Sequence, residues 1–203
     1  MGDMAADVRG TQLPAAVLAS PESRDPRPLV GEPLPLDLLN THWIEASQLR
    51  DLLDTIPGTM IWLGSAVIEP DYRPRRIDEA HRAALRAARD ILLAVAEQPH
   101  DDAARAAFND LLARGHRHGC LGPDGPTTKV VIADPVWTVP WLAAEAYLDL
   151  LDRLPDRIRQ CQHPDCVLWY LDTSPSGRRR WCSMSICGNR SKARRHYNRS
   201  KPN

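Results

Sequence analysis

The clearest pattern of apolar and polar positions in this sequence predicts a long amphipathic helix over residues 76–98. The positions that recur there every three or four residues, as on one face of a helix, are Ile77, His81, Ala84, Leu85, Ala88, Ile91, Leu92 and Val95. Pro99 ends this helix. Asp101 then caps a second helix with a similar apolar face, which runs to Gly115.

Four further segments are predicted to be helical. Residues 34–46 form a short apolar helix, and residues 51–56 add a turn that a Pro-Gly pair ends. The apolar stretch 59–68 fits either a helix or a buried strand, and we favour the helix. Residues 139–154 form the last apolar helix before Pro155.

Residues 116–133 predict a β-hairpin, because a Pro-Asp-Gly-Pro turn at 123–126 separates two short extended runs. The second strand is expected at 129–133. Residues 1–33 hold five prolines among scattered charges, so we expect a flexible leader there. The predicted fold is therefore mainly α with a small β-hairpin (α+β), with a helical domain over 34–155.

Composition limits the class of protein. An apolar fraction of 43 % is sufficient for a packed core. The longest apolar runs fall far short of the roughly 20 residues that span a bilayer, and the N-terminus carries no secretory pattern. We therefore expect a cytoplasmic protein without a membrane segment. The sequence has no glycine-rich phosphate loop and no nucleophile elbow, so we expect no enzymatic activity.

The 203 residues have a formal net charge of zero, but the charge is unevenly divided. Residues 1–156 hold 15 basic and 24 acidic side chains, whereas residues 157–203 hold 11 basic and only two acidic ones. The chain thus combines an acidic body of charge −9 with a basic segment of charge +9. This asymmetry indicates a polyanionic partner, although a solvated tail explains the charge alone equally well.

Four of the five cysteines lie in the basic segment as two C-x4-C pairs, Cys161 with Cys166 and Cys182 with Cys187. Without a secretory signal, a disulfide framework is not expected. Two short loops that each supply two thiolates are typical of a structural zinc site. We predict one structural Zn²⁺ on these four cysteines. His163 is a less favoured ligand, because four sulfurs already complete the coordination shell.

Local patterns predict how this segment folds. Residues 167–173 are apolar and aromatic and predict a strand, with residues 178–183 as its return strand. Ser183 is a suitable N-cap for a helix from Met184 to about Asn198, with Cys187 in the first turn. The arrangement describes a zinc ribbon or a treble-clef-like module. About forty residues bury too little apolar surface to fold well alone, so the metal must contribute much of the stability.

The basic segment also resembles a known family. Cys182-Ser-Met, followed by Cys-Gly-Asn-Arg at 187–190 and preceded by LWYLDTS, resembles the CGNR zinc finger over about residues 157–199. Residues 34–155 resemble the ABATE domain that usually precedes this finger, and LDLLNT at 36–41 is similar to its opening motif. The resemblance implies a zinc finger over residues 157–203 behind a domain that regulates transcription under stress.

A basic helix that a zinc site holds in place, beside an arginine-rich turn, is suited to binding the phosphates of duplex DNA. For Asn189 and Arg190 we favour a structural role, either capping the backbone or packing on Trp169 or Trp181. The residues predicted as candidates for DNA contact are Arg178, Arg179, Arg180, Arg190, Lys192, Arg194, Arg195 and Arg199.

The helical domain offers two weaker candidate sites. Its tryptophans could line a pocket for an aromatic small molecule, although core packing is the plainer explanation. The residues of this possible ligand pocket are Asn40, Trp43, Trp62, Trp137 and Trp141. His116, His118 and Cys120 alternate along a strand and could form a metal corner, but we favour ordinary strand residues.

The favoured hypothesis is a zinc-dependent transcription regulator that binds DNA through the finger and senses a small-molecule effector or a partner through the helical domain. A second hypothesis is a structural zinc module for protein–protein interaction, docking an acidic partner or the acidic body of the same chain. A third is a repurposed ligand-binding or enzymatic helical domain. The sequence leaves the oligomeric state open.

Overall fold

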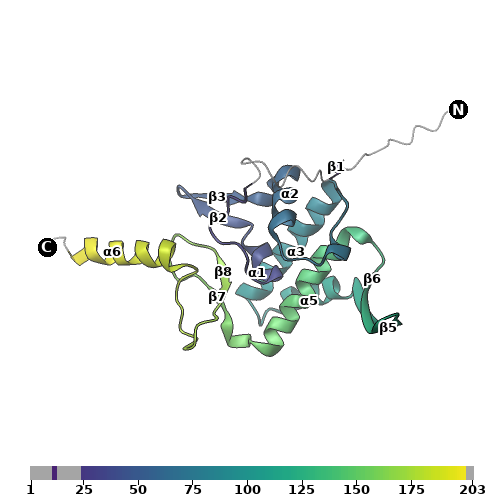
Figure 1. Ribbon diagram of the computed structural model, residues 1–203. Helices are drawn as coiled ribbons and strands as arrows, with labels where there is room; N and C mark the ends of the chain where they lie inside the picture. The colour runs from purple at the N-terminus through teal and green to yellow at the C-terminus, as the bar shows by residue number, and fades with distance from the viewer. Residues whose placement is uncertain (1–10, 13–23, 200–203) are drawn as a thin grey trace.

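The computed structural model describes residues 11–12 and 24–199. A helical body is followed by a small module from which the last helix projects (Figure 1). Helix α1 (Leu34–Leu39) lies inside the body and packs against α3 (Glu79–Glu97) and α5 (Thr138–Arg153). Helices α2 (Ile56–Ser65) and α4 (Asp102–Leu112) complete the body. The mainly α fold with small antiparallel strand pairs is confirmed.

The two predicted long helices form, and their N-caps explain where each begins. Asp101 caps α4 by accepting a hydrogen bond from the main-chain N–H of Ala104 at 2.7 Å, as expected. Helix α3 begins at Glu79 rather than at residue 76, because Asp78 is its N-cap. The two preceding residues form strand β4 (Arg76–Ile77), which pairs with β1 (Thr11–Gln12).

The predicted helix over 34–46 is wrong beyond Leu39. The chain continues as β2 (His42–Glu45), which pairs antiparallel with β3 (Gln48–Asp51). Ala46 and Ser47 join the strands with φ angles of +48° and +65°. Two positive φ angles are what a tight type I′ hairpin turn requires, and Asn-Gly is its usual sequence. An Ala-Ser turn gives no such signal, so the sequence did not reveal the hairpin.

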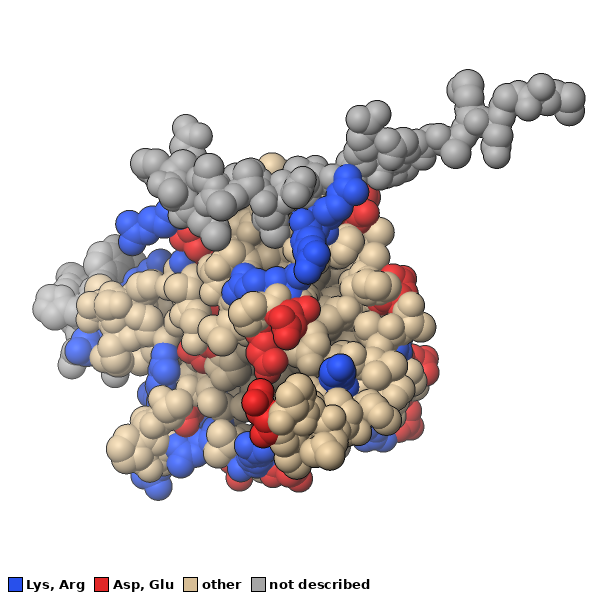
Figure 2. Space-filling view, turned by 45° about the vertical axis from the view of Figure 1, so that its right-hand side comes forward, with Lys and Arg blue, Asp and Glu red and all other residues tan. Residues whose placement is uncertain are grey.

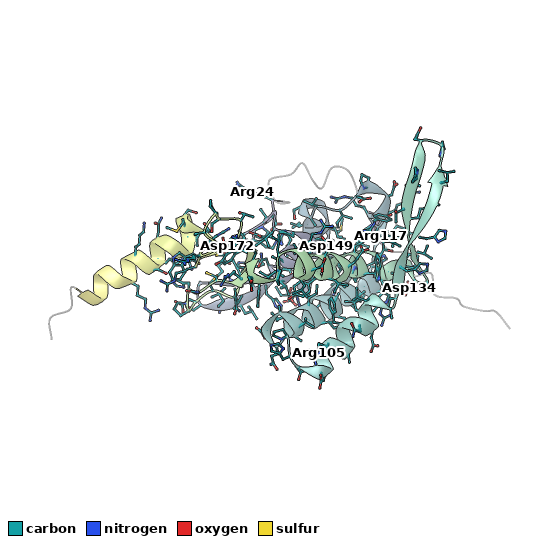
Figure 3. The ribbon with its side chains drawn as sticks, turned by 90° about the horizontal axis from the view of Figure 1, so that it is seen from below. Arg24, Arg105, Arg117, Asp134, Asp149 and Asp172 are labelled. Carbon is teal, nitrogen blue, oxygen red and sulfur yellow. The ribbon has the colours of Figure 1, made fainter. Side chains whose placement is uncertain are left out.

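The predicted hairpin at 116–133 is present as β5 (Gly115–Gly122) and β6 (Gly125–Ile132). It projects from the body at the end opposite to the C-terminal helix (Figure 3). Helix α2 begins at Ile56, before the predicted residue 59, since Thr55 accepts a hydrogen bond from the N–H of Gly58. The prediction that Pro57 and Gly58 end a helical turn over 51–56 is therefore wrong, because both lie in the first turn of α2. Short 3₁₀ turns connect the elements at Leu52–Asp54, Pro70–Tyr72, Pro135–Trp137 and Pro155–Arg157.

Residues 24–33, expected to belong to a flexible leader, are instead fixed to the body. The Arg27 side chain is fully buried and donates hydrogen bonds to the carboxylates of Asp25 and Asp37. Asp37 also accepts a hydrogen bond from the indole N–H of Trp62 at 3.0 Å. A buried guanidinium needs such partners to offset its desolvation. The other residues of the expected leader lie outside the described ranges, apart from β1.

The C-terminal module contains β7 (Ile158–Gln160), β8 (Trp169–Leu171), a π-helical turn (Met184–Gly188) and helix α6 (Asn189–Arg199). The expected strand is shorter than 167–173, and residues 178–183 are not its return strand. Strand β8 pairs with the upstream strand β7 instead, across the first cysteine loop. The side chain of Arg179 holds that segment in an irregular path through hydrogen bonds to the carbonyls of Trp181 and Cys182.

On one face of the molecule, a group of basic side chains lies next to a row of acidic ones (Figure 2). Within the described part of the chain, no helix combines the length and apolar character needed to cross a bilayer.

Candidate metal centre

The four cysteines of the module direct their sulfur atoms at one centre. All four Sγ atoms lie within 4.8 Å of one another, and Cys182 Sγ is 3.8 Å from Cys166 Sγ and 3.6 Å from Cys187 Sγ. A tetrahedral ion with metal–sulfur bonds of about 2.3 Å separates its sulfurs by about 3.8 Å. None of the cysteines forms a disulfide. The spacing therefore fits four sulfur ligands around one metal ion.

Each half of the centre comes from a different local structure. Cys161 and Cys166 lie in the loop between β7 and β8, where the N–H of Cys161 still donates to the carbonyl of Leu168 at 2.9 Å. Cys182 ends the irregular segment, and Cys187 lies in the π-helical turn before α6. The metal would thus join a hairpin tip to the start of a helix.

The π-helical turn explains how Cys187 enters the first turn of the predicted helix. The N–H of Gly188 donates to the carbonyl of Ser183 at 3.0 Å, a bond that spans five residues. Ser183 occupies the N-cap position as expected, but its hydroxyl contacts Ser185 at 2.7 Å and makes no capping bond. The wide turn therefore replaces the regular helical start that the sequence suggested.

Crowding of the sulfurs makes the cysteines strongly interdependent. Hydrogen bonds from the thiols of Cys166 and Cys182 lower the pKa of Cys161 to about 2. The same interactions, with burial, raise the pKa of Cys182 far above the ordinary thiol value, and that of Cys166 to about 12. Four thiolates cannot occupy this site together without a positive charge between them. A divalent cation bound between the sulfurs would supply that charge, and a donor set of four sulfurs suits zinc.

His163 lies close to the centre but outside it. Its side chain is buried, its Nδ1 accepts a hydrogen bond from the N–H of Asp165 at 3.2 Å, and its ring packs edge-on against Trp181. The described metal-ligand cluster consists of the four cysteines alone. The imidazole shapes the first cysteine loop. With four sulfurs, the shell is closed and has no open position for catalysis.

The arginines of the irregular segment differ in their partners. The guanidinium of Arg179 lies 4.4 Å from the ring centroid of Tyr170 and donates to the carbonyls of Trp181 and Cys182. Arg180 lies over the Trp181 ring and donates to Gln162 at 2.7 Å. Arg179 is therefore committed to the fold of the loop, whereas Arg178 and Arg180 remain exposed.

Helix α6 presents basic side chains to solvent. Arg190, Lys192 and Arg194 are exposed. The side chains of Arg195 and Arg199 lie outside the described residues, although their backbone belongs to α6. Asn189 donates to the carbonyl of Ser185 at 3.2 Å, which agrees with the capping role favoured for it, and Arg180 rather than Arg190 lies over Trp181.

The residues proposed for an aromatic ligand pocket are distributed among separate contacts. Trp62 is fully buried, and the indole N–H of Trp141 donates to the carbonyl of Leu112 at 2.8 Å. Trp137 lies beneath the guanidinium of Arg114, 3.8 Å from it. Trp43 is buried on β2. The structure gives these tryptophans packing contacts in different places and does not assemble them around one cavity.

Asn40, the polar member of that set, joins the body to the metal module. Its side chain amide donates to the carbonyl of Trp169 at 2.9 Å and accepts from the N–H of Trp169 at 2.8 Å. Asn40 thereby occupies the edge of β8 that β7 leaves open, as a neighbouring strand would. Glu32 extends this contact by accepting from the N–H of Leu171 at 2.9 Å. Sequence reasoning missed Glu32, because its partner lies 139 positions away.

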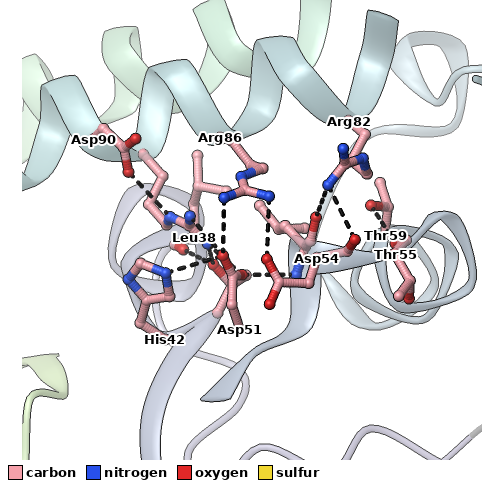
Figure 4. A network of polar contacts seen from close by, with 12 residues as sticks. Leu38, His42, Asp51, Asp54, Thr55, Thr59, Arg82, Arg86 and Asp90 are labelled. Carbon is pink, nitrogen blue, oxygen red and sulfur yellow. Dashed lines mark hydrogen bonds and ion pairs between the residues drawn. The ribbon is translucent and has the colours of Figure 1, made fainter. Parts of the chain in front are cut away.

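The polar residues that follow α1 form a second network inside the body (Figure 4). Arg89, which is 1 % exposed, binds Asp51 through two hydrogen bonds of 2.6 and 2.9 Å and also reaches the hydroxyl of Thr41. Burial opposes the charge of Asp51, but hydrogen bonds from His42 and Arg89 outweigh it and hold its pKa well below the usual range. This network fixes the β2–β3 hairpin against α3.

The alternating residues on β5 do not form a metal site within the described ranges. His116 and His118 are exposed on the projecting hairpin, and Cys120 is half-buried. No metal-ligand cluster other than the four cysteines occurs among the described side chains. This placement agrees with ordinary strand residues.

Two family models match this chain. The ABATE model, whose description reads "Putative stress-induced transcription regulator", matches residues 32–153. The model of the CGNR zinc finger matches residues 157–200. The first match contains the whole of α1 to α5, and the second contains all four clustered cysteines. No curated protein matches the sequence.

Proposed function

This chain belongs to the ABATE family and ends in a CGNR zinc finger, and from this premise we propose that it is a zinc-dependent, DNA-binding regulator of transcription. In this proposal, one Zn²⁺ is held by the four clustered cysteines, and α6 contacts duplex DNA. The body senses a small-molecule effector or a protein partner. The proposal includes no catalytic step.

The observation that supports DNA contact is the placement of α6. The helix starts directly after the metal centre, extends away from the acidic body (Figure 1), and contains no acidic residue from Asn189 to Arg199. Eleven residues give a length of about 16 Å, enough to lie across a major groove about 12 Å wide. Arg190, Lys192 and Arg194 would contact phosphates, with Arg178 and Arg180 alongside.

Such contacts position a protein on DNA without reading its sequence. Arg179 plays a different part, because its guanidinium is already engaged by Tyr170 and two carbonyls. Its replacement would therefore act through the shape of the metal loop. The arginines of the segment thus separate into DNA-contacting and loop-holding side chains.

Fluorescence anisotropy of a labelled DNA duplex, titrated with the zinc-loaded full chain at several salt concentrations, tests the proposal. The double variant Lys192→Gln/Arg194→Gln should lower the slope of log K against log salt by about two units, since each phosphate contact contributes about 0.9. The control Arg105→Gln/Arg117→Gln removes two charges that lie away from α6 (Figure 3) and should leave the slope nearly unchanged.

Absence of binding at low salt, with zinc confirmed in the protein, would refute DNA contact. In that case, a pull-down from nuclease-treated lysate would test whether the zinc module binds a protein instead. Equal effects of the two double variants would show that binding follows net charge rather than α6.

A further inference from the structure

The body contains a cavity that the zinc-finger proposal does not use. Its volume is about 550 Å³, which is within the range of small-molecule sites. It lies where the end of α2, the loop before α3, the base of the β5–β6 hairpin and the start of α5 meet. Apolar side chains form most of its wall, among them Leu63, Leu85, Val130, Ile132 and Val139.

The charges at this cavity are opposite in sign to those of the body around it. Arg73, Arg75 and Arg76 line it together with only one carboxylate, Asp71. The body up to residue 156 carries a net charge of −9, so three arginines at one apolar cavity are a local reversal. A cavity with apolar walls and a positive rim attracts an organic anion.

Neither Arg73 nor Arg75 forms an ion pair with a side chain that the structure describes. Arg73 donates to the main-chain carbonyls of Ile68 at 3.3 Å and Ala66 at 2.7 Å, and also to that of Leu63. These bonds cap the end of α2 and fix the guanidinium, but carbonyls neutralise no charge. Arg75 is exposed and makes no ion pair with any side chain that the structure describes.

Two further polar groups of the wall are oriented by their neighbours. The Nδ1 atom of His81 lies 2.7 Å from the carboxylate of Asp78, so its Nε2 atom can bind another partner. The hydroxyl oxygen of Tyr72 accepts from the N–H of Val130 at 3.3 Å, which leaves its own proton to donate. An apolar wall with a few oriented polar groups is typical of a specific ligand site.

We propose that this cavity binds a small organic anion with an apolar or aromatic body and one carboxylate, whose charge pairs with Arg75. This inference deepens the proposed sensing role of the body and rests on it for its biological purpose. The site differs from the tryptophan-lined pocket expected from the sequence, since none of its lining residues is a tryptophan.

Helix α5 connects the cavity to the metal module. Thr138 and Val139, at the start of α5, line the cavity, and α5 ends at Arg153, shortly before β7. The helix also packs against α1, which is followed directly by Asn40 at the junction with β8. A ligand that shifts the start of α5 therefore acts on an element that leads into the zinc finger.

Isothermal titration of the zinc-loaded full chain with 2-naphthoate tests the ligand class. The neutral alcohol 2-naphthalenemethanol is the matched probe, since it has nearly the same apolar body without the charge. The carboxylate should bind at least fivefold more tightly than the alcohol. Arg75→Gln should remove most of that difference, and Arg105→Gln, a distant exposed arginine, should not.

A second variant tests the place of binding. Ile132→Trp fills the cavity and should weaken both probes, provided that its thermal unfolding remains cooperative. Because Arg75 is exposed, Arg75→Gln stays informative even if the filled variant does not fold. Equal affinity for the two probes, no binding of 2-naphthoate, or an undiminished preference in Arg75→Gln would overturn the proposal. These titrations contain no DNA, so they succeed or fail independently of the anisotropy experiment.

Discussion

The helical body and the zinc module occupy neighbouring parts of one chain but are stabilised by different means. In the body, side chains such as Leu53, Trp62 and Leu92 are fully buried in a continuous apolar core. In the described part of the module, the buried apolar residues apart from the cysteines are Leu168, Trp169 and Tyr170. A module with so small a core depends on its metal, whereas the body folds on hydrophobic burial.

The helical body and the zinc module meet at β8, which forms hydrogen bonds with residues of both. One edge of β8 is paired with β7 inside the module, and the other edge is bound by Asn40 and Glu32 of the body. The module is therefore anchored to the body by these hydrogen bonds and by apolar packing, because Leu168, Trp169 and Tyr170 belong to the same buried cluster as the core of the body. The metal would hold the module on its other side. Each of these supports can be removed separately.

Removal of the metal should have the largest effect. Structural zinc sites contribute on the order of 10 kcal/mol or more of apparent folding free energy. Chelation of the metal, or Cys182→Ser, should unfold β7 to α6 and leave the body folded. Amide hydrogen exchange should show fast exchange in the module and unchanged protection in α3. Cys120→Ser, on the projecting hairpin, is the control. Loss of protection in the body as well as in the module would show that the body also depends on the metal.

Breaking the buried ion pair of the body should have the next largest effect. Asp51→Asn leaves the buried Arg89 with only its longer ion pair to the exposed Asp90 at 3.4 Å, and loss of such a buried pair costs about 3–5 kcal/mol. Denaturant unfolding should report this loss in the body, while the metal content of the protein stays the same. Arg153→Gln on α5 is the control, because its exposed ion pair with Asp149 lies outside this network and contributes less than about 1 kcal/mol.

The same carboxylate gives the body an acid-sensitive stability. Asp51 has a pKa below the value of about 3.9 that it has in the unfolded chain, so its contribution is complete above that value and is lost as the pH falls below it. Stability measured between about pH 5 and pH 2 should fall less steeply in Asp51→Asn than in the natural protein. An equal dependence of stability on pH in the two proteins would show that Asp51 does not cause the acid sensitivity.

Local signals allowed the long helices and the clustering of the four cysteines to be predicted. Asp101 caps α4 as the sequence indicated, and the two C-x4-C pairs converge because each is a short loop. Partners distant in the sequence could not be predicted. The β-rich appearance of 167–173 suggested a strand with 178–183 as its return strand, but β8 pairs with β7 across the first cysteine loop. Asn40 has its partner 129 positions away, and no local pattern carries that information.

Removal of the Asn40 side chain should destabilise the protein less than loss of the metal or of the buried ion pair. It tests whether the helical body and the zinc module are mechanically coupled. Asn40→Ala leaves the N–H and the carbonyl of Trp169 buried without these partners, which costs about 1–3 kcal/mol. Amide exchange at β8 should increase, while α4 and the metal content remain unchanged. Asn109→Ala, an exposed asparagine on α4, is the control. If the exchange of β8 is the same in both variants, the metal and the remaining contacts of β8, such as that with Glu32, are sufficient to hold the module, and the body has no mechanical connection to α6 through Asn40.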